Sequence, residues 1–226
     1  MAGKTMSSGT RKNWAPRVFP TDPQAKARLE EWLDAGGEGP LDAIGLDLSD
    51  ADLSDANLQQ SWFTDAKLVG AKLVGADLYR SDAEGADFSR ADLTRASLVR
   101  VNLDDAVLRD AVLDGADLVK ASLYDCDATN ASLRGTRILG ASLLGVDLRG
   151  ADLSHAILQE NSFKVTVDHR TKVEGLSGTV FGPVQVIDDH GAEHEIAGEA
   201  LERWVRERGG SIKVLPVPDG KRDTSA

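Results

Sequence analysis

The sequence is poor in cysteine, histidine and aromatic residues. Its 226 residues include one cysteine, Cys126, which excludes an internal disulfide and a cysteine-rich zinc site. Aromatic residues make up only 5% of the chain, so leucine and alanine must fill any core. No Gly-rich phosphate loop and no serine motif typical of a catalytic triad is present. We therefore expect a protein that is not an enzyme and that binds no cofactor.

Long apolar runs are also missing. No stretch approaches the length that crosses a bilayer, and the first twenty residues carry scattered charges where a secretory signal would have an apolar segment. The formal net charge of -11 argues against direct binding to nucleic acid, for which a basic face is expected. These absences predict a cytoplasmic protein that contacts neither a membrane nor nucleic acid.

Histidine offers one alternative to this view. The spacing His190-x-x-x-His194 would present two metal ligands on one side of a helix, and nearby carboxylates could add oxygens. The glycine between the two histidines and the flanking alternation of apolar residues instead predict a hairpin turn, where the rings need not share a face. We therefore expect no metal site.

A five-residue period dominates the middle of the chain. Of the 24 positions spaced five apart from Leu48 to Phe163, 18 are Leu and the others are Phe, Ala or Ile. A second row, two residues earlier, runs from Leu46 to Asn161 and is Ala at 16 of 24 positions. Cys126 stands in this second row, so we expect it to be packed inside.

Neither a helix nor a straight strand can use this period. Five residues advance about 500° around a helix, so the leucines would spread over its whole surface. On a strand an odd period sends successive leucines to opposite faces. The chain must therefore turn a corner once per unit and keep the small and large residues inside. Gly at eight of the last positions favours such corners, because it adopts positive φ readily.

Units such as "ADLSD" and "ADLTR" continue without a break of register from Leu46 to Val165. They resemble the units of the pentapeptide-repeat proteins. The resemblance implies an all-β solenoid, namely a right-handed quadrilateral β-helix with four units per coil, so that 24 units make about six coils. Some members of the family protect DNA gyrase, and their acidic rod is thought to occupy the DNA saddle of that enzyme.

The segments outside the repeat predict caps for the rod. Residues 1–45 comprise an N-terminal tail and a helix that begins at Asp22 and Pro23 and ends at Gly36 and Gly37. Residues 166–218 predict a β-β-α-β module, with its helix at 198–208 and its last strand at 212–217. The module either caps the last coil or forms a docking surface of its own. Residues 219–226 are polar and are expected to be a tail.

Units twenty residues apart should stack on one side of such a rod, so outward charges can be assigned to four faces. The face that begins at Ser61 has a net charge of -5, whereas the other three have -2, -2 and +1. Its six carboxylates are Asp65, Asp82, Glu84, Asp104, Asp105 and Asp125. They span about 14 Å, over which duplex DNA carries roughly eight phosphates. This strip predicts either a partner-binding, DNA-like surface or a solvated face that aids solubility.

The neighbouring face, which begins at Ala56, combines apolar and basic residues. Its outward residues in four successive coils are Tyr79, Val99, Val119 and Leu139, beside Arg80, Arg100 and Lys120. An outward apolar stripe predicts a docking or homodimer surface. The alternative is that β-formers stack on one another there and are screened by the basic side chains.

Taken together, the sequence favours a non-enzymatic scaffold or adaptor that binds a protein partner. The alternative function is a DNA-mimicking regulator or protector of DNA gyrase or another topoisomerase, which would confer resistance to topoisomerase poisons.

Overall fold

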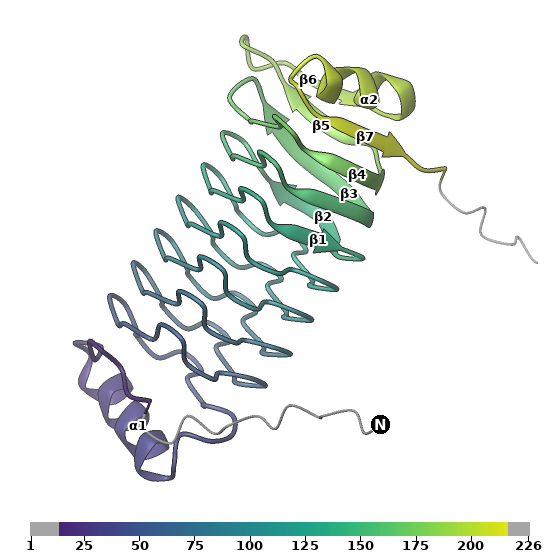
Figure 1. The fold of residues 1–226 in the computed structure, drawn as a ribbon. Helices are drawn as coiled ribbons and strands as arrows, with labels where there is room; N and C mark the ends of the chain where they lie inside the picture. The colour runs from purple at the N-terminus through teal and green to yellow at the C-terminus, as the bar shows by residue number, and fades with distance from the viewer. Residues whose placement is uncertain (1–13, 217–226) are drawn as a thin grey trace, which may run out of the picture.

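The chain winds into a stack of similar coils (Figure 1). Parallel bridges join residues twenty positions apart along most of it. In the computed structural model, which describes residues 14–216, these bridges start with Asp42 and Trp62 and reach Asp152 and Lys172. Each turn of the chain, here called a coil, therefore contains four five-residue units. Backbone groups of one coil pair with the coils on both sides, so the ladder of hydrogen bonds is continuous. The predicted β-helix solenoid is confirmed.

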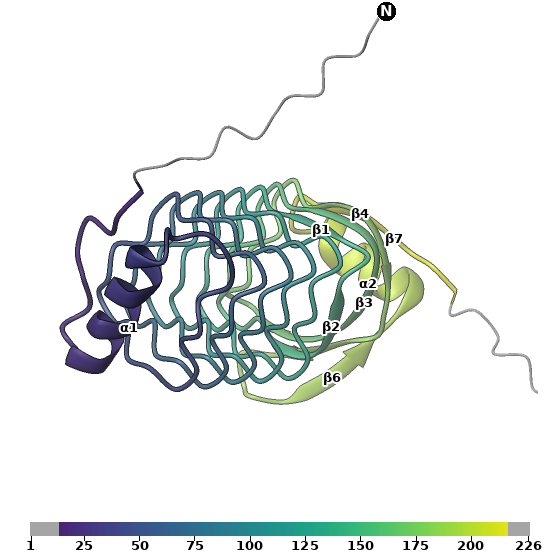
Figure 2. The same cartoon turned by 90° about the horizontal axis from the view of Figure 1, so that it is seen from below.

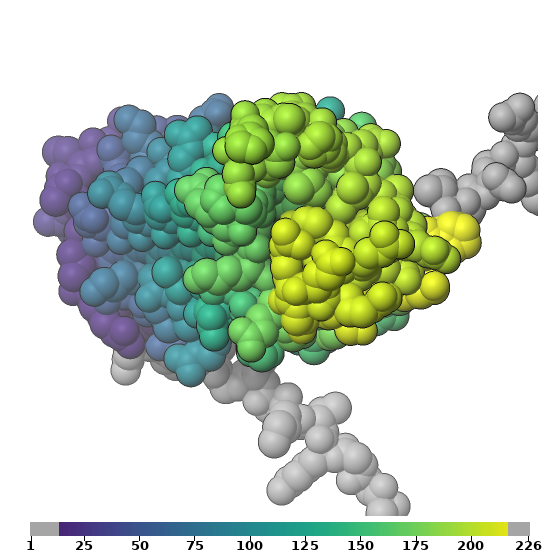
Figure 3. All heavy atoms as spheres, turned by 90° about the horizontal axis from the view of Figure 1, so that it is seen from above, coloured from purple at the N-terminus to yellow at the C-terminus, as the bar shows by residue number. Residues whose placement is uncertain are grey.

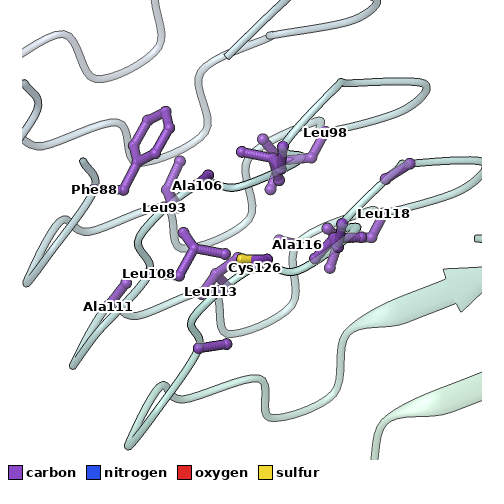
Figure 4. Close-up of a cluster of buried hydrophobic side chains, with 14 of the residues drawn as sticks. Phe88, Leu93, Leu98, Ala106, Leu108, Ala111, Leu113, Ala116, Leu118 and Cys126 are labelled. Carbon is purple, nitrogen blue, oxygen red and sulfur yellow. The ribbon is translucent and has the colours of Figure 1, made fainter. Parts of the chain in front are cut away.

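The first and third residues of each unit point inward. Both rows are buried almost without exception, and they form one continuous apolar core with the caps. Residues twenty apart, such as Leu98 and Leu118, occupy equivalent places in neighbouring coils (Figure 4). Because the first residue of a unit is small, it leaves room inside the coil for the large third residue of a neighbouring unit. This explains why the residues of the two rows differ in size.

Each corner is a β-turn between two units. The N–H of the first residue of a unit donates to the C=O of the third residue of the unit before, as in Ala96 to Leu93 at 2.9 Å. The fifth residue has positive φ, as a type II turn requires. The eight expected glycines do so, but so do many other residues, with φ of 57° at Arg95 and 59° at Arg100. Because this conformation costs about 1–2 kcal/mol for such residues, the ladder rather than local preference sets these corners.

The ladder begins one unit earlier than the predicted boundary at Leu46. The unit "LDAIG" has its leucine and alanine exchanged, with Leu41 in the first position and Ala43 in the third, and both are buried. Its Asp42 forms the first parallel bridge, with Trp62. The exchange hid this unit from a search based on leucine spacing.

At its other end the ladder continues past the predicted boundary at Val165. Val165 pairs with Val146, nineteen residues earlier, and the spacing returns to twenty at Lys172 and Asp152. A shift of one residue therefore ends the leucine period at Phe163, although the coil itself continues.

Helix α1 (Pro23–Asp34) covers the N-terminal end of the rod (Figures 1 and 2). The Asp22 carboxylate accepts a hydrogen bond from the Ala25 N–H at 2.8 Å, and Pro23 is the first helical residue, so the predicted start is confirmed. Ala25, Leu29 and Trp32 are buried in the same core as the coils. The apolar side of α1 thus closes the first coil.

A short segment before α1 pairs with the first coil, which the sequence analysis did not predict. The Asp52 N–H donates to the Val18 C=O at 2.9 Å, and the Asp52 C=O accepts from the Arg17 N–H at 3.1 Å. The Trp14 indole donates to the Ser54 C=O at 2.9 Å. Because an open sheet edge invites pairing with another chain, this segment protects the start of the ladder.

The last coils and the segment after them contain the regular strands. Their bounds are β1 (Arg137–Leu139), β2 (Ser142–Asp147), β3 (Ile157–Asp168), β4 (Ser177–Phe181), β5 (Val184–Ile187), β6 (Glu193–Ile196) and β7 (Ser211–Val214), with α2 (Gly198–Arg206) between β6 and β7. The sheet order is β6-β5-β3-β4-β7, and β1 and β2 also pair with β3. The expected hairpin, helix and strand are therefore present, and the predicted tails at 1–13 and 219–226 lie outside the described residues.

The C-terminal segment continues the ladder instead of standing apart from it. β4 and β5 pair in parallel with β3, and β7 pairs in parallel with β4. Leu201 and Val205 of α2 are buried, and this part of the chain covers the end of the rod (Figure 3). A Cβ on Gly210 would lie 2.6 Å from the Val173 carbonyl oxygen, so this close approach needs glycine. These contacts favour the capping alternative.

Glu202 of α2 protects the outer edge of β7. Its carboxylate accepts a hydrogen bond from the Val214 N–H at 3.0 Å and lies 3.2 Å from the Lys213 ammonium. These two contacts hold the pKa of Glu202 below its usual value. The last strand therefore offers one fewer free N–H for pairing with another chain.

Two alanines in the third row differ in their surroundings. Ala128 lies between Leu108 and Leu148 in successive coils, and a small apolar void borders all three side chains. Ala83 follows Phe63 by one coil, and both are fully buried. The Phe63 ring is larger than a leucine side chain, so it fills the space that the small Ala83 side chain leaves in the core.

We expect opposite effects when these alanines are enlarged. Ala128→Val should raise the free energy of unfolding by about 0.5–2 kcal/mol, because the added methyl groups gain contacts in the void. Ala83→Val should lower it by about 1–3 kcal/mol, because the same groups must compete with Phe63 for space. Guanidinium unfolding followed by circular dichroism measures both changes. Shifts of the same sign would contradict this account.

Candidate protein-binding faces

Aspartate at the second position of a unit has a structural role that the sequence analysis did not predict. Its carboxylate accepts a hydrogen bond from the N–H two residues on, as Asp92 does from Thr94 at 3.0 Å and Asp152 does from Ser154 at 2.9 Å. The frequent "ADL" units carried this signal, because Asp bonds to its own backbone two residues on in Asx turns. These carboxylates are thus part of the fold rather than simple fillers of a solvated position.

Hydrogen bonds of this kind also keep the carboxyl group of Asp152 ionised. Burial raises the pKa of this carboxyl, but hydrogen bonds from Ser154 and Arg134 and the nearby Lys172 outweigh burial, so the pKa lies below its usual value. The Arg134 guanidinium is 3.0 Å and the Lys172 ammonium 3.5 Å from the carboxylate. The negative charge of Asp152 is therefore largely compensated by basic residues of neighbouring coils.

The six predicted carboxylates lie on one face in four successive coils. Bridges from Trp62 to Asp82, from Asp82 to Asn102 and from Asn102 to Ser122 place their units in register. We call this surface, made of the units that begin at 41, 61, 81, 101, 121, 141 and 161, the acidic face. The structure brings these residues together as expected, while their role in binding stays a prediction.

Asp82 and Asp104 are engaged within the rod by two hydrogen bonds each, and the exposed Glu84 by one, from the Asn102 side-chain amide at 3.4 Å. Asp104 accepts hydrogen bonds from the Ser122 hydroxyl at 2.5 Å and from the Tyr124 N–H at 2.8 Å in the next coil. Asp82 accepts from the Glu84 N–H at 3.3 Å and from the Asn102 side-chain amide at 3.0 Å. Both residues are half-buried and support the ladder.

The other four carboxylates, Asp65, Glu84, Asp105 and Asp125, are exposed. Asp65 and Asp125 lie over glycines of the following coil: a Cβ on Gly85 would be 2.6 Å from Asp65 Oδ1, and Gly145 is approached still more closely by Asp125. Glycine at these corners therefore makes room for the preceding carboxylate. The four exposed residues are the part of the strip that a partner could contact.

Large apolar side chains are also exposed on the acidic face. Ile44 is 53% exposed, Trp62 45%, Tyr124 48% and Leu144 37%. They are four of the six large apolar residues exposed in residues 14–216. They form no continuous apolar column and so were not predicted as a surface, although their second and fourth positions in the units already indicated that they point outward.

The predicted apolar and basic stripe has a different character. Hydrogen bonds such as Arg100 N–H to the Val119 C=O, at 2.9 Å, confirm that its members occupy successive coils. Tyr79, Val99, Val119 and Leu139 are only half-buried and are not among the large exposed apolar residues. Arg80 lies over the Tyr79 ring at 5.3 Å. This geometry agrees with β-formers that stack on one another beneath basic side chains.

Histidine and cysteine form no reactive group in the described part of the chain. His194 Nε2 is 3.1 Å from Asp188 Oδ2 across the hairpin, and His169 Nδ1 is 3.0 Å from Asp189 Oδ1. Residues 14–216 contain no group of three or more side chains that could hold a metal ion. Cys126 is fully buried, and burial, reinforced by Asp127 and Asp104, raises the pKa of its thiol far above the usual value.

Neither helix in residues 14–216 is long and apolar enough to cross a membrane.

Comparisons with solved structures find several pentapeptide repeat proteins. A pentapeptide repeat protein from the Arabidopsis thaliana thylakoid lumen is 33% identical over 41% of this chain and 64% of its own, less than two thirds of its length, with a TM-score of 0.40. HetL of Nostoc sp. strain PCC 7120, a pentapeptide repeat protein involved in heterocyst differentiation regulation, is 23% identical over 74% of this chain and 98% of its own, with a TM-score of 0.36.

A third similar structure is QnrB1, a plasmid-mediated fluoroquinolone resistance protein. It is 12% identical over 78% of this chain and 92% of its own, with a TM-score of 0.27. A search of curated protein sequences gives no match.

The family comparison is more specific. The description "Pentapeptide repeats" matches eight copies whose segments together span residues 42–160, more than half of the chain. The matched span agrees with the ladder that begins at Asp42. The chain therefore belongs to the pentapeptide-repeat family.

Proposed function

We propose that this protein is a non-enzymatic scaffold that binds another protein through its acidic face. The observation that carries the proposal is the gathering of exposed groups there: four carboxylates and four large apolar side chains on one side of the rod. Exposed apolar side chains that gather on one surface mark interaction sites more often than scattered ones do.

The rod suits this role because its outward side chains have fixed spacing. Each unit presents them from a backbone held by hydrogen bonds to the coils on both sides. We take the coil to be right-handed and four-sided, as in the family, so that each face is nearly flat. A partner then meets a rigid surface and loses little affinity to ordering it.

A second candidate function is regulation or protection of DNA gyrase or another topoisomerase by mimicry of DNA. The exposed carboxylates Asp65, Glu84, Asp105 and Asp125 favour it, because they follow one another at the coil spacing of about 4.8 Å. The half-buried Asp82 and Asp104 weaken it, since their oxygens already accept hydrogen bonds within the rod.

Asp82 and Asp104 are unsuitable positions for testing either function. Reversing the charge of Asp82 or Asp104 would break hydrogen bonds of the ladder, so any lost activity would be ambiguous. Neutral variants of exposed residues avoid this problem. Asp105 and Asp125 have positive φ, which asparagine tolerates as well as aspartate does.

We expect the triple variant Glu84→Gln, Asp105→Asn, Asp125→Asn to lose a partner that the wild-type protein captures from its native cell extract. The reason is that three exposed charges disappear while the backbone conformation is kept. Captured proteins are identified by mass spectrometry, and supercoiling by purified gyrase is measured with the same variant. Loss of an effect on gyrase would select the second candidate.

A matched control removes three charges elsewhere on the rod. The variant Asp50→Asn, Asp110→Asn, Glu160→Gln again changes two exposed corner aspartates and one exposed glutamate. It should capture the same partner as the wild type. Equal capture by the test variant and the wild type would refute a binding role of the acidic face.

A homodimer formed through the apolar and basic stripe, and a cytoplasmic location, remain predictions. The half-buried state of Val99 and Val119 gives the dimer less support than the sequence suggested.

A further inference from the structure

The acidic face has a definite order along the rod. Ile44 and Trp62 are exposed in its first two coils, and Tyr124 and Leu144 are exposed in its fifth and sixth coils. The coils between them present the carboxylates of the units that begin at 81 and 101. With about 4.8 Å per coil, Trp62 and Leu144 are about 19 Å apart along the rod axis. Large apolar side chains are therefore exposed only at the two ends of this face, whereas exposed carboxylates run from Asp42 to Asp125 and stand without large apolar neighbours in the middle.

This order is unlike the surface of duplex DNA. A nucleic acid presents one negative charge per about 1.7 Å along its whole length, without interruption by large apolar groups. Trp62 and Tyr124 place large apolar groups beside the charges of Asp65 and Asp125, and Leu144 lies where the run of carboxylates has ended. The order instead complements a ligand that has basic groups in its middle and apolar groups at its ends.

Backbone pairing within the rod restricts the conformation of such a ligand. In the middle of the face, the Ser122 N–H donates to the Val101 C=O at 3.0 Å, and the Ser122 C=O accepts from the Leu103 N–H at 2.8 Å. The face therefore has no free edge to which an extended segment could add as a strand. An extended segment lying on it would leave its backbone groups to water, whereas an α-helix pairs them internally.

The geometry points to an α-helix of a partner protein as the ligand of the acidic face, with Arg or Lys in its middle turns and a large apolar residue at each end. This inference rests on the proposed scaffold function and names the chemistry of its partner. A helix rises about 1.5 Å per residue, so apolar residues at i and i+11 lie about 16 Å apart, with basic residues at i+4 and i+7 on the same side. This spacing matches the distance from Trp62 to the Tyr124 and Leu144 pair.

The apolar contacts at the ends and the charged contacts in the middle contribute differently to binding. Burial of the apolar end groups supplies most of the affinity, because each removes apolar surface from water. The central charges select the partner and its orientation and speed association, and they are weakened by salt. Binding should therefore depend on the apolar ends even at high ionic strength.

Synthetic helical peptides of 18 residues test the inference directly. The ordered probe carries Leu or Trp at i and i+11 and Arg at i+4 and i+7. The reversed probe has the same composition with Arg at the ends and the apolar residues in the middle. Fluorescence anisotropy with the full-length protein should show that the ordered probe binds at least about tenfold more tightly. Equal affinity for the two probes would overturn the inference.

A pair of protein variants locates the binding. Tyr124→Ser with Leu144→Ser removes one apolar end and should weaken the ordered probe by at least about tenfold. Val18→Ser with Ile157→Ser removes the two large exposed apolar side chains that lie elsewhere, 51% and 48% exposed, and should leave the affinity unchanged. Circular dichroism checks that all variants are folded. Equal weakening by both pairs would also overturn the inference.

Two further outcomes identify another occupant or separate this inference from the proposed function. If the wild-type protein sediments as a dimer that Tyr124→Ser with Leu144→Ser converts to a monomer, the occupant is a second copy and the inference is wrong. If partner capture requires Glu84, Asp105 and Asp125 but is unaffected by the Tyr124 and Leu144 changes, the scaffold function stands and the helix inference fails.

Discussion

Replacing Asn161 with alanine should lower the free energy of unfolding by about 2–5 kcal/mol. Asn161 is fully buried; its Oδ1 accepts a hydrogen bond from the Ala141 N–H at 2.8 Å, and its Nδ2 donates to the Ile138 C=O at 2.6 Å. At other corners these two backbone groups bond to each other, as the Ala121 N–H does to the Leu118 C=O at 3.1 Å. At this corner the side chain is inserted between them.

The expected loss of stability arises because two backbone polar groups would be buried without a hydrogen-bond partner. The alanine variant would leave one N–H and one C=O unsatisfied inside the rod, at about 1–3 kcal/mol each. Urea unfolding of the variant and of a Ser162→Ala control, whose side chain is half-buried beside it, measures the difference. The control should change stability by less than about 1 kcal/mol. A similarly small change for Asn161→Ala would mean that the corner closes and forms the direct bond.

Replacing Leu103 with alanine should cost about 2–5 kcal/mol, the range for a buried leucine whose removal leaves a cavity. Leu103 is 1% exposed in the third row, and its N–H donates to the Ser122 C=O at 2.8 Å. The coils above and below are held by their own ladder bonds, so they cannot collapse freely into the space. The cost should therefore not fall below this range.

The control for Leu103 is Val107→Ala in the following unit. Val107 takes the outward second position and is half-buried, so its truncation should change stability by less than about 1 kcal/mol. Thermal and guanidinium unfolding of both variants measure the difference. Similar losses for the two positions would mean that the inward and outward rows have been assigned wrongly.

The rows of the repeat could be assigned from the sequence because each position has one physical requirement. An inward third residue such as Leu103 must be large and apolar, and an inward first residue such as Ala106 must be small. Because this requirement is repeated twenty-four times at a spacing of five residues, neither a helix nor a straight strand can satisfy it, and a coil that turns once per unit remains. The same regularity hid exceptions: the unit at Leu41 exchanges the two sizes, and the pairing of Val146 with Val165 shifts the register by one residue.

The candidate site could be predicted only in part. The period placed Asp82, Asp104 and Asp105 on one face, and the structure agrees. It could not show that Asp104 accepts hydrogen bonds from Ser122 and Tyr124, because those partners lie in another coil. For the same reason the stripe at Val99 and Val119 looked open in sequence, whereas stacking between coils half-buries it.

By itself, the sequence determined the five-residue period, the inward rows and the face to which each outward residue belongs, because these follow from local geometry repeated many times. Only the tertiary structure decided how exposed each outward side chain is, which carboxylates are engaged in the ladder, and how the segment at Val18 and the strand β7 protect the ends. Those properties depend on contacts between residues about twenty or more positions apart, and a local pattern does not encode the distances between them.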